Sequence, residues 1–287
     1  MAVVLFDGVA YGMLLFLMAV GLSVTMGLMN FVNLAHGSFA MAGGYAAAVL
    51  MNAHGVGFGM ALLAAFVASA LLGAVLEWLL YRRLYRAHPL DQVLLSIGLV
   101  FVSIAAFTWL FGPTLQPFTL PGWLQGQVEV AGVGLGCYRL FLIGCGLAVL
   151  AALLLALGRT RYGAMVRAAV DNQRVAAGTG IHVQRLFLLT FSLGCGLAGL
   201  GGALSLGVLG LEPGFALKYL VYFLLVVCVG GAGTITGPFA AALLVGIVDV
   251  AGKYYLPQTG AFLIYGVMIV MLLLRPHGLV VRKGVTA

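Results

Sequence analysis

The sequence predicts an all-α, polytopic integral membrane protein with about eight or nine transmembrane helices. Of its 287 residues, 63% are hydrophobic and only 7% are charged, whereas a soluble domain is roughly 45–50% apolar and 25% charged. So few charged side chains cannot cover a surface that faces water, which excludes a soluble enzyme, a disordered chain and a nucleic-acid-binding domain. A helix needs roughly 20 apolar residues to cross a bilayer, so this length allows eight or nine crossings with short loops.

Nine apolar runs along the chain correspond to these helices. They are assigned to helix because lipid offers no hydrogen-bond partner to open backbone groups. The second run and the seventh to ninth are short or interrupted by glycine, so the fold is expected to contain two interrupted short helices. The first run has no Lys or Arg before it, unlike a cleavable signal peptide, and is interpreted as a retained span. The runs are residues 8–29, 34–51, 57–81, 90–111, 138–157, 186–210, 215–231, 236–252 and 259–275.

The basic residues predict the orientation of the helices. Eleven of the fourteen Lys and Arg residues lie in three segments, 82–86, 159–185 and 275–283. Because cytoplasmic loops collect Lys and Arg, all three segments are expected in the cytoplasm. With nine spans the N-terminus faces out and the C-terminus faces the cytoplasm. If one short segment is re-entrant, eight spans remain and the N-terminus moves inside. Residues 1–287 are interpreted as a single transmembrane domain.

Two connecting segments are long enough to have structure of their own. Residues 112–137 are rich in Pro and Gly and are predicted to form an ordered external loop. Residues 158–185 contain five basic residues and are expected in the cytoplasm. Within them, residues 163–177 are predicted to form one helix of about four turns, ended by Gly178 and Gly180. Such a basic, alanine-rich helix is suited to dock in a partner's groove, the alternative being a solvated loop.

The first break between apolar runs places polar side chains at membrane depth: Asn30, Asn33, His36 and Ser38. Polar groups without partners are costly in lipid, so we expect these four to face other helices, water or a solute. The alternative is that Asn33 or Ser38 caps the next helix. His36 is not expected to bind a metal, because no second ligand stands one helical turn away.

A second break, residues 230–238, is rich in glycine and ends in Pro238, at the expected start of a helix. Its glycines can expose backbone amides and carbonyls to a passing solute or to a neighbouring helix, the alternative being a tight cytoplasmic turn. Paired interrupted segments in the two halves of a membrane protein point to a transport pathway. The candidate pathway residues are therefore Asn30, Asn33, His36, Ser38, Gly230, Gly231, Gly233, Thr234 and Thr236.

The two breaks are also similar in sequence. Residues 37–42 read Gly-Ser-Phe-Ala-Met-Ala, and residues 237–242 read Gly-Pro-Phe-Ala-Ala-Ala, at an offset of 200 residues. Arg82-Arg83 and Arg282-Lys283 stand at the same offset. An internal repeat and chance similarity both remain open.

Three further patterns have structural interpretations. The GxGxxG match at 194–199 lies within an apolar run, without a preceding strand, and is not a nucleotide-binding motif. Asp249 and Lys253 have the i, i+4 spacing of a helical ion pair, and Glu77, near Arg82 and Arg83, is expected to pair or to reach the membrane surface. The small-residue face predicted for close helix packing consists of Gly194, Ala198, Gly202 and Ser205.

No catalytic or nucleotide-binding motif is present in the sequence. It contains no GxxxxGK[ST], no HExxH and no GxSxG. Its four cysteines form no CxxC pair, so neither a zinc site nor a redox pair is indicated. The chain is therefore interpreted as a transport subunit, not an enzyme, with no cofactor of its own. Any energy from ATP has to come from another chain.

The chain resembles the LivH-type permeases of branched-chain amino acid ABC importers over nearly its full length. The resemblance is carried by residues 21–37, which contain Asn33-Leu34-Ala35-His36-Gly37, and by residues 163–181 and 191–203. It implies a permease in the bacterial inner membrane that works with a second, LivM-type permease, two cytoplasmic ATPases that use ATP, and a periplasmic binding protein. The segment 163–181 resembles the part that receives the ATPase, and its candidate coupling residues are Gly163, Arg167, Asp171, Asn172, Ala176 and Gly180.

Two positions depart from the pattern of this family. Many relatives carry Glu where this chain has Ser38, and many carry Pro-Glu where it has Gln173-Arg174. Branched-chain amino acids are the cargo that the resemblance implies, and other small polar solutes remain open. The alternative function is a stand-alone, ion-coupled secondary transporter, which needs membrane-embedded charged residues and would depend on Glu77 and Asp249.

Overall fold

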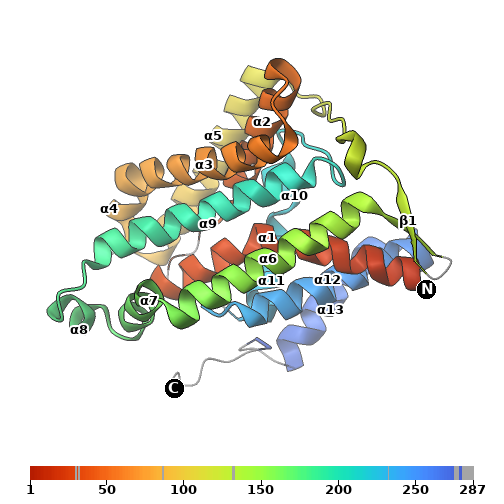
Figure 1. Cartoon of the computed structure of the whole chain (residues 1–287). Coiled ribbons are helices and arrows are strands. Elements are labelled where there is room, and N and C mark those ends of the chain that lie inside the picture. The colour runs from red at the N-terminus through yellow and green to blue at the C-terminus, as the bar shows by residue number, and fades with distance from the viewer. Residues whose placement is uncertain are drawn as a thin grey trace.

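The computed structural model of the chain is a bundle of long helices with one small β-hairpin (Figure 1). It describes residues 1–29, 31, 33–85, 87–130, 133–231, 233–274 and 278–279. Its elements are α1 (Ala2–Met29), α2 (His36–His54), α3 (Phe58–Leu76), the π turn η1 (Glu77–Tyr81), α4 (Arg82–Leu84), α5 (Pro89–Phe111), η2 (Gly122–Leu124), β1 (Gln127–Val130), β2 (Val133–Gly136), α6 (Cys137–Arg159), α7 (Arg161–Asp171), α8 (Gln173–Gly178), α9 (Val183–Ser205), α10 (Phe215–Lys218), α11 (Leu220–Gly230), α12 (Thr236–Tyr255) and α13 (Gly260–Leu274).

Six helices of the described chain are long and apolar enough to cross a membrane. Two shorter apolar helices follow α9, so the predicted number of eight or nine spans is not confirmed. α2 is outside both groups, since it is rich in Gly and Ala and contains His and Asn. The six are Ala2–Gly27, Phe58–Leu84, Pro89–Phe111, Cys137–Arg159, Val183–Ser205 and Thr236–Tyr255, and the shorter two are Phe215–Gly230 and Phe262–Met271.

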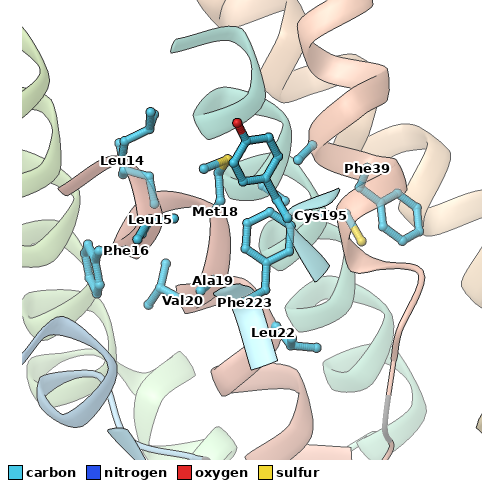
Figure 2. Packing of buried hydrophobic residues seen from close by; sticks show 14 of the residues in the cluster. Leu14, Leu15, Phe16, Met18, Ala19, Val20, Leu22, Phe39, Cys195 and Phe223 are labelled. Carbon is cyan, nitrogen blue, oxygen red and sulfur yellow. The ribbon is translucent and has the colours of Figure 1, made fainter. Parts of the chain in front are cut away.

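The centre of the bundle is formed by α1 and α9, which are mostly buried, whereas α5 and α6 are mostly exposed. α1 packs most extensively against α12, and α9 packs against α2 and α3. Figure 2 shows the core at α1, where Met18 and Leu22 belong to the same buried cluster as Phe223 of α11. The exposed side chains of α3, α5 and α13 are largely apolar, as a surface in contact with lipid requires.

Glycines allow the central helices to approach closely, as the predicted small-residue face requires. A Cβ atom at Gly202 would lie 1.8 Å from the carbonyl oxygen of Ala40 in α2. A Cβ atom at Gly21 of α1 would lie 2.3 Å from the carbonyl oxygen of Gly194. Gly194, Ala198, Gly202 and Ser205 are all buried, which confirms the prediction for this face of α9. Such contacts stabilise membrane helices where the hydrophobic effect between them is weak.

The segment between α5 and α6 is ordered by its hairpin and by contacts with the bundle. Gln127 pairs with Gly136, and Val130 pairs with Val133. The side chain of Asn52 donates to the carbonyl of Pro117 at 2.8 Å, and the backbone N–H of Gln116 donates to the carbonyl of Leu211 at 2.8 Å. The described part of this segment therefore has structure of its own, and its external position stays a prediction.

Several predicted boundaries need correction. The run 186–210 forms a helix only as far as Ser205, and the run 215–231 is divided at Tyr219 into α10 and α11. The run 57–81 continues through the π turn to Leu84. Glu77 is 2% exposed and accepts a hydrogen bond of 2.6 Å from the Tyr85 hydroxyl, so it is paired within the protein.

The helices that follow the two breaks begin 200 residues apart, which is the same offset as that between the two similar sequences. α2 begins at His36 and α12 begins at Thr236, each after a break that follows an apolar helix. The two breaks in the backbone and the two similar sequences are therefore separated by the same 200 residues.

Candidate functional site

The first break is a compact turn between α1 and α2. Asn33 is 1% exposed; its Oδ1 accepts hydrogen bonds from the backbone N–H of Ala35 at 3.1 Å and from the Tyr81 hydroxyl at 2.9 Å. The carboxamide oxygen therefore fixes the start of α2, as a side chain in an Asx turn does. Asn30 and Val32 lie outside the described residues.

Other polar atoms of this segment have no partner in the described part of the protein. Nδ2 of Asn33 is one such atom. The ring of His36 lies against the backbone of Met18, and both side chains are 1% exposed. Tyr45, further along α2, has an unpartnered hydroxyl as well. Buried polar groups are normally hydrogen-bonded, so each exception calls for a water or a solute. The carboxamide of Asn33 therefore keeps an N–H donor without a partner among the described residues.

Ser38 does not cap α2. The helix has Ala35 at its N-cap, without a side-chain cap, and the hydroxyl of Ser38 lies 2.7 Å from that of Ser103 in α5. The capping alternative for Ser38 is therefore wrong. The Ser38 hydroxyl connects α2 to α5 instead.

The second break is held against the end of α1. The backbone N–H of Gly233 donates to the carbonyl of Ser23 at 2.9 Å, and the Ser23 hydroxyl donates to the carbonyl of Thr234 at 3.0 Å. Gly233 has a φ of 81°, a conformation that favours glycine. A Cβ atom at Gly27 would lie 2.0 Å from the Cα atom of Gly233. The sequence left two alternatives, a tight turn and glycines that face a neighbouring helix. The described part of the segment is a tight turn whose glycines pack against α1, so both features occur together. Ala232 lies outside the described residues.

The two ends of this turn also touch each other. A Cβ atom at Gly237 would lie 1.9 Å from the carbonyl oxygen of Gly230, and the hydroxyl of Thr234 donates to the carbonyl of Gly231 at 3.1 Å. α12 begins at Thr236, which is exposed, with Ile235 at the N-cap and no side-chain cap. The N-terminal amides of α12 therefore stand at the edge of the turn.

A cavity of about 250 Å³ joins this turn to α7. It brings Arg167 of the predicted coupling segment together with Gly233, Thr234 and Thr236 of the second break. No described residue of the first break lines it. Its remaining walls are formed by α1, α6, α7 and the turn. These residues are Val24, Gly27, Leu154, Leu157, Val166, Val170 and Ile235.

Polar contacts hold α7 against α6 and α9. Thr160 caps it, accepting from the backbone N–H of Gly163 at 3.1 Å, and Arg167 donates to the carbonyl of Leu157 at the end of α6. The hydroxyls of Tyr162 and Thr190 lie 2.6 Å apart and join α7 to α9. Burial raises the pKa of the Tyr162 phenol above its ordinary value of about 10, so the hydroxyl stays protonated. α7 is therefore attached to two long helices.

The predicted single helix over 163–177 is wrong, because it is divided into α7 and α8 at Asn172. This residue has an extended backbone with a φ of −157°. Its side chain accepts hydrogen bonds from the N–H groups of Arg174 and Val175, at 3.0 and 3.1 Å. The division follows because an Asn side chain competes with the helix for backbone donors and caps the next one.

The predicted end of the segment is confirmed. α8 ends at Gly178, and Gly180 has a φ of 88°. Ala176 is buried and its carbonyl accepts from the Thr179 hydroxyl at 2.8 Å.

The outer surface of α7 and α8 combines basic and apolar side chains. Met165 is 38% exposed and Val175 is 62% exposed, and Arg161, Asp171 and Arg174 are exposed around them. α7 and α8 therefore present both apolar and charged side chains at the surface of the protein. Among the described residues, no three His, Cys, Asp or Glu side chains gather as they would around a metal ion.

Sequence reasoning missed Tyr81 and Ser23, which hold the two breaks. Each binds a segment far away in the sequence, 48 and 211 residues distant. Their polar side chains within apolar runs were the signal that could have identified them, because such groups need partners in lipid.

Comparisons with known proteins agree with this architecture. The family model for the branched-chain amino acid transport system permease component matches residues 4–272. BraD of Pseudomonas aeruginosa, a high-affinity branched-chain amino acid transport system permease protein, is 27% identical, over 98% of this chain and 96% of its own length. A probable branched-chain amino acid transport permease protein LivH of Methanocaldococcus jannaschii is 28% identical, over 96% and 91%.

LivH of Escherichia coli K12, also a high-affinity permease protein of that system, is 26% identical, over 98% of this chain and 96% of its own length. No solved structure matches the chain. Because the family model covers most of the sequence, and the relatives match from end to end, the chain belongs to the family of permease components of branched-chain amino acid transport systems.

Proposed function

We propose that this chain is the transmembrane subunit of an ABC importer, moving branched-chain amino acids across the bacterial inner membrane. The cavity between α7 and the second break carries the proposal, because it joins the predicted coupling residue Arg167 to three predicted pathway residues. Motion of α7 would thereby act directly on Gly233, Thr234 and Thr236. The unpartnered Nδ2 atom of Asn33 would supply a hydrogen-bond donor for a polar solute.

The remaining subunits follow from this function. We propose a second, LivM-type permease, two cytoplasmic ATPases that bind and use ATP, and a periplasmic binding protein. This chain would bind no cofactor itself. The exposed surface of α7 and α8, with Met165 and Val175 among basic residues, is the proposed contact of an ATPase, and its helices would move as a rigid lever.

The proposed topology has nine crossings, with the N-terminus outside and the C-terminus in the cytoplasm. It counts α2 as a span, although α2 is not apolar enough by composition, because it is enclosed by protein: most of its first half is buried. The basic segment that contains α7 and α8 then lies in the cytoplasm, as its charge predicts. A protease that cuts near Arg167 from outside intact cells would contradict this topology.

A stand-alone ion-coupled carrier has less support. That mechanism would depend on the embedded carboxylates Glu77 and Asp249. Glu77 is engaged by the hydroxyl of Tyr85 at 2.6 Å, and Asp249 is paired with Lys253 at 2.6 Å, as its spacing predicted.

The test is to replace Arg167 with Glu in the assembled transporter. Charge reversal removes the bond to Leu157 and places an anion in the cavity, so we expect ATP hydrolysis to continue while uptake of leucine falls. Arg159→Glu is the matched control, since Arg159 is exposed at the end of α6, does not line the cavity and lies outside the surface of α7 and α8. Arg167→Lys, which keeps the cation, should retain much of the uptake. Unchanged uptake in Arg167→Glu would contradict the lever.

A further inference from the structure

A second cavity lies at the opposite end of the bundle from α7. It has a volume of about 190 Å³ and is lined by residues near the start of α1 and α6 and the end of α12. Figure 1 places this end beside the N-terminus and β1. Neither interrupted segment contributes to it. We call it the Asp7–Lys253 cavity, after two of its lining residues.

Four charged side chains from three helices meet in this cavity. They form two ion pairs: Arg139 with Asp7, and Lys253 with Asp249 at 2.6 Å. In a chain with only 7% charged residues, such a concentration is not explained by a need for surface charge. Nor does stability explain it well, because an ion pair whose cation is in contact with solvent contributes little to the free energy of folding.

The two members of each pair are not equally accessible. The side chains of Arg139 and Lys253 are 44% and 56% exposed, whereas those of Asp7 and Asp249 are 19% and 2% exposed. Arg has five N–H donors and Lys has three, and each pair uses only part of this capacity. The cations therefore present unused donors to the cavity, and the carboxylates lie behind them.

Apart from Tyr11, whose ring centroid lies 5.8 Å from Nζ of Lys253, the other walls of the cavity are apolar. Leu142, Val208 and Val250 line it beside the charges. A ligand that matches these walls carries an anionic oxygen group for Arg139 and Lys253, an ammonium group for the partly accessible Asp7, and an apolar body. We propose that the Asp7–Lys253 cavity binds such a zwitterion, with one of two sources: a free aliphatic α-amino acid or the headgroup of an aminophospholipid.

Binding in this cavity can be tested independently of the proposed function, because it is measured without ATP or uptake. The full chain is purified in detergent free of phospholipid and titrated calorimetrically with L-leucine. Two analogues each lack one charge: 4-methylpentanoate has no ammonium, and isoamylamine has no carboxylate. If both charges are recognised, each analogue binds roughly tenfold or more weakly than leucine.

Arg139→Gln is the test variant, because Asp7 keeps some contact with solvent when its partner is neutralised. It should weaken binding by roughly tenfold or more, as expected for the loss of a charge-assisted hydrogen bond. Lys218→Gln is the matched control: it disrupts the exposed ion pair of Lys218 and Glu212, 3.0 Å long, and should leave binding unchanged. Leu209→Trp fills the cavity from its loop side without removing a charge, and should also prevent binding.

The lipid arm uses nanodiscs of phosphatidylethanolamine or phosphatidylcholine and native mass spectrometry. If the headgroup is the ligand, phosphatidylethanolamine stays bound to the wild type and is lost from Arg139→Gln and Leu209→Trp, while leucine does not bind. If leucine binds in the detergent experiment and is lost in those variants, the amino acid is the source. The proposal is overturned if neither ligand binds, or if both variants bind as the wild type does.

Discussion

The hydroxyl of Tyr81 donates a 2.9 Å hydrogen bond to Oδ1 of Asn33 and so connects the π turn η1 to the first break. Tyr81 is completely buried, and its ring packs against Phe31 and Phe191 with centroid distances of 5.2 and 4.9 Å. A π turn adds a residue to one helical turn, which changes the face on which the following residues lie; such turns are frequent at functional sites. Tyr81 thereby orients the Asn33 carboxamide, whose Nδ2 has no described partner.

Replacing Tyr81 with Phe should therefore lower uptake while the ring packing remains. The loss of one buried hydrogen bond should lower the free energy of unfolding by about 1–2 kcal/mol, measured by thermal unfolding in detergent. Tyr138→Phe is the matched control, because its buried hydroxyl donates to the carbonyl of Leu204 at 2.6 Å, away from both breaks. We expect it to lose similar stability and to keep uptake. Equal uptake losses in the two variants would contradict a positioning role for Tyr81.

Replacing Ser23 with Ala should loosen the second break. The variant loses the side-chain bond to Thr234 but keeps the backbone bond between Ser23 and Gly233. We therefore expect faster amide hydrogen exchange over residues 233–235, and a stability loss of roughly 0.5–1.5 kcal/mol.

The control for this experiment lies two residues further along α1. Thr25→Val removes a hydroxyl that bonds only within its own helix, to the carbonyls of Gly21 and Leu22 at 3.0 Å. Exchange in residues 233–235 should be unchanged in this variant. If Thr25→Val accelerates that exchange as much as Ser23→Ala does, the Ser23 hydroxyl does not hold the break.

Replacing Asn172 with Ala should release the start of α8. The variant loses both side-chain hydrogen bonds to the N–H groups of Arg174 and Val175, a capping loss worth about 1 kcal/mol. We expect faster proteolysis in α8 and weaker stimulation of the ATPase by the permease. Asn172→Asp preserves an acceptor at the cap and should behave as the wild type. If Asn172→Ala stimulates the ATPase as the wild type does, the cap that divides α7 from α8 is not needed for coupling.

The elements that the sequence predicted well depend on local properties. Long apolar runs identify the spans because their length is fixed by the bilayer. The ion pair of Asp249 and Lys253 follows from helical spacing alone, and it forms at 2.6 Å. The small-residue face of α9 is likewise periodic within one helix.

The rest depends on contacts between distant segments or on competition within a single turn. The division at Asn172 was not predicted, because an Asn side chain in a helical sequence does not reveal whether it binds the backbone ahead. The cavity that joins Arg167 to Thr234 arises only when α7 and α12 are brought together. The composition of α2 hides its central position: its low apolarity is compatible with burial because α3 and α9 pack around it.

The close packing of α2 against α9 gives a stability prediction. At Gly202 a Cβ atom would lie 1.8 Å from the carbonyl oxygen of Ala40 and 2.5 Å from its carbonyl carbon, so Gly202→Ala forces two backbones apart. We expect a destabilisation of about 1–3 kcal/mol or more, as in other overpacked cores, and a lower unfolding temperature in detergent. At Gly98 of α5 nothing lies within 4 Å of the added atom. Gly98→Ala should therefore stabilise the helix by roughly 0.5–1 kcal/mol. If Gly202→Ala raised the unfolding temperature as much as Gly98→Ala, helix propensity and not the contact with α2 would decide the effect.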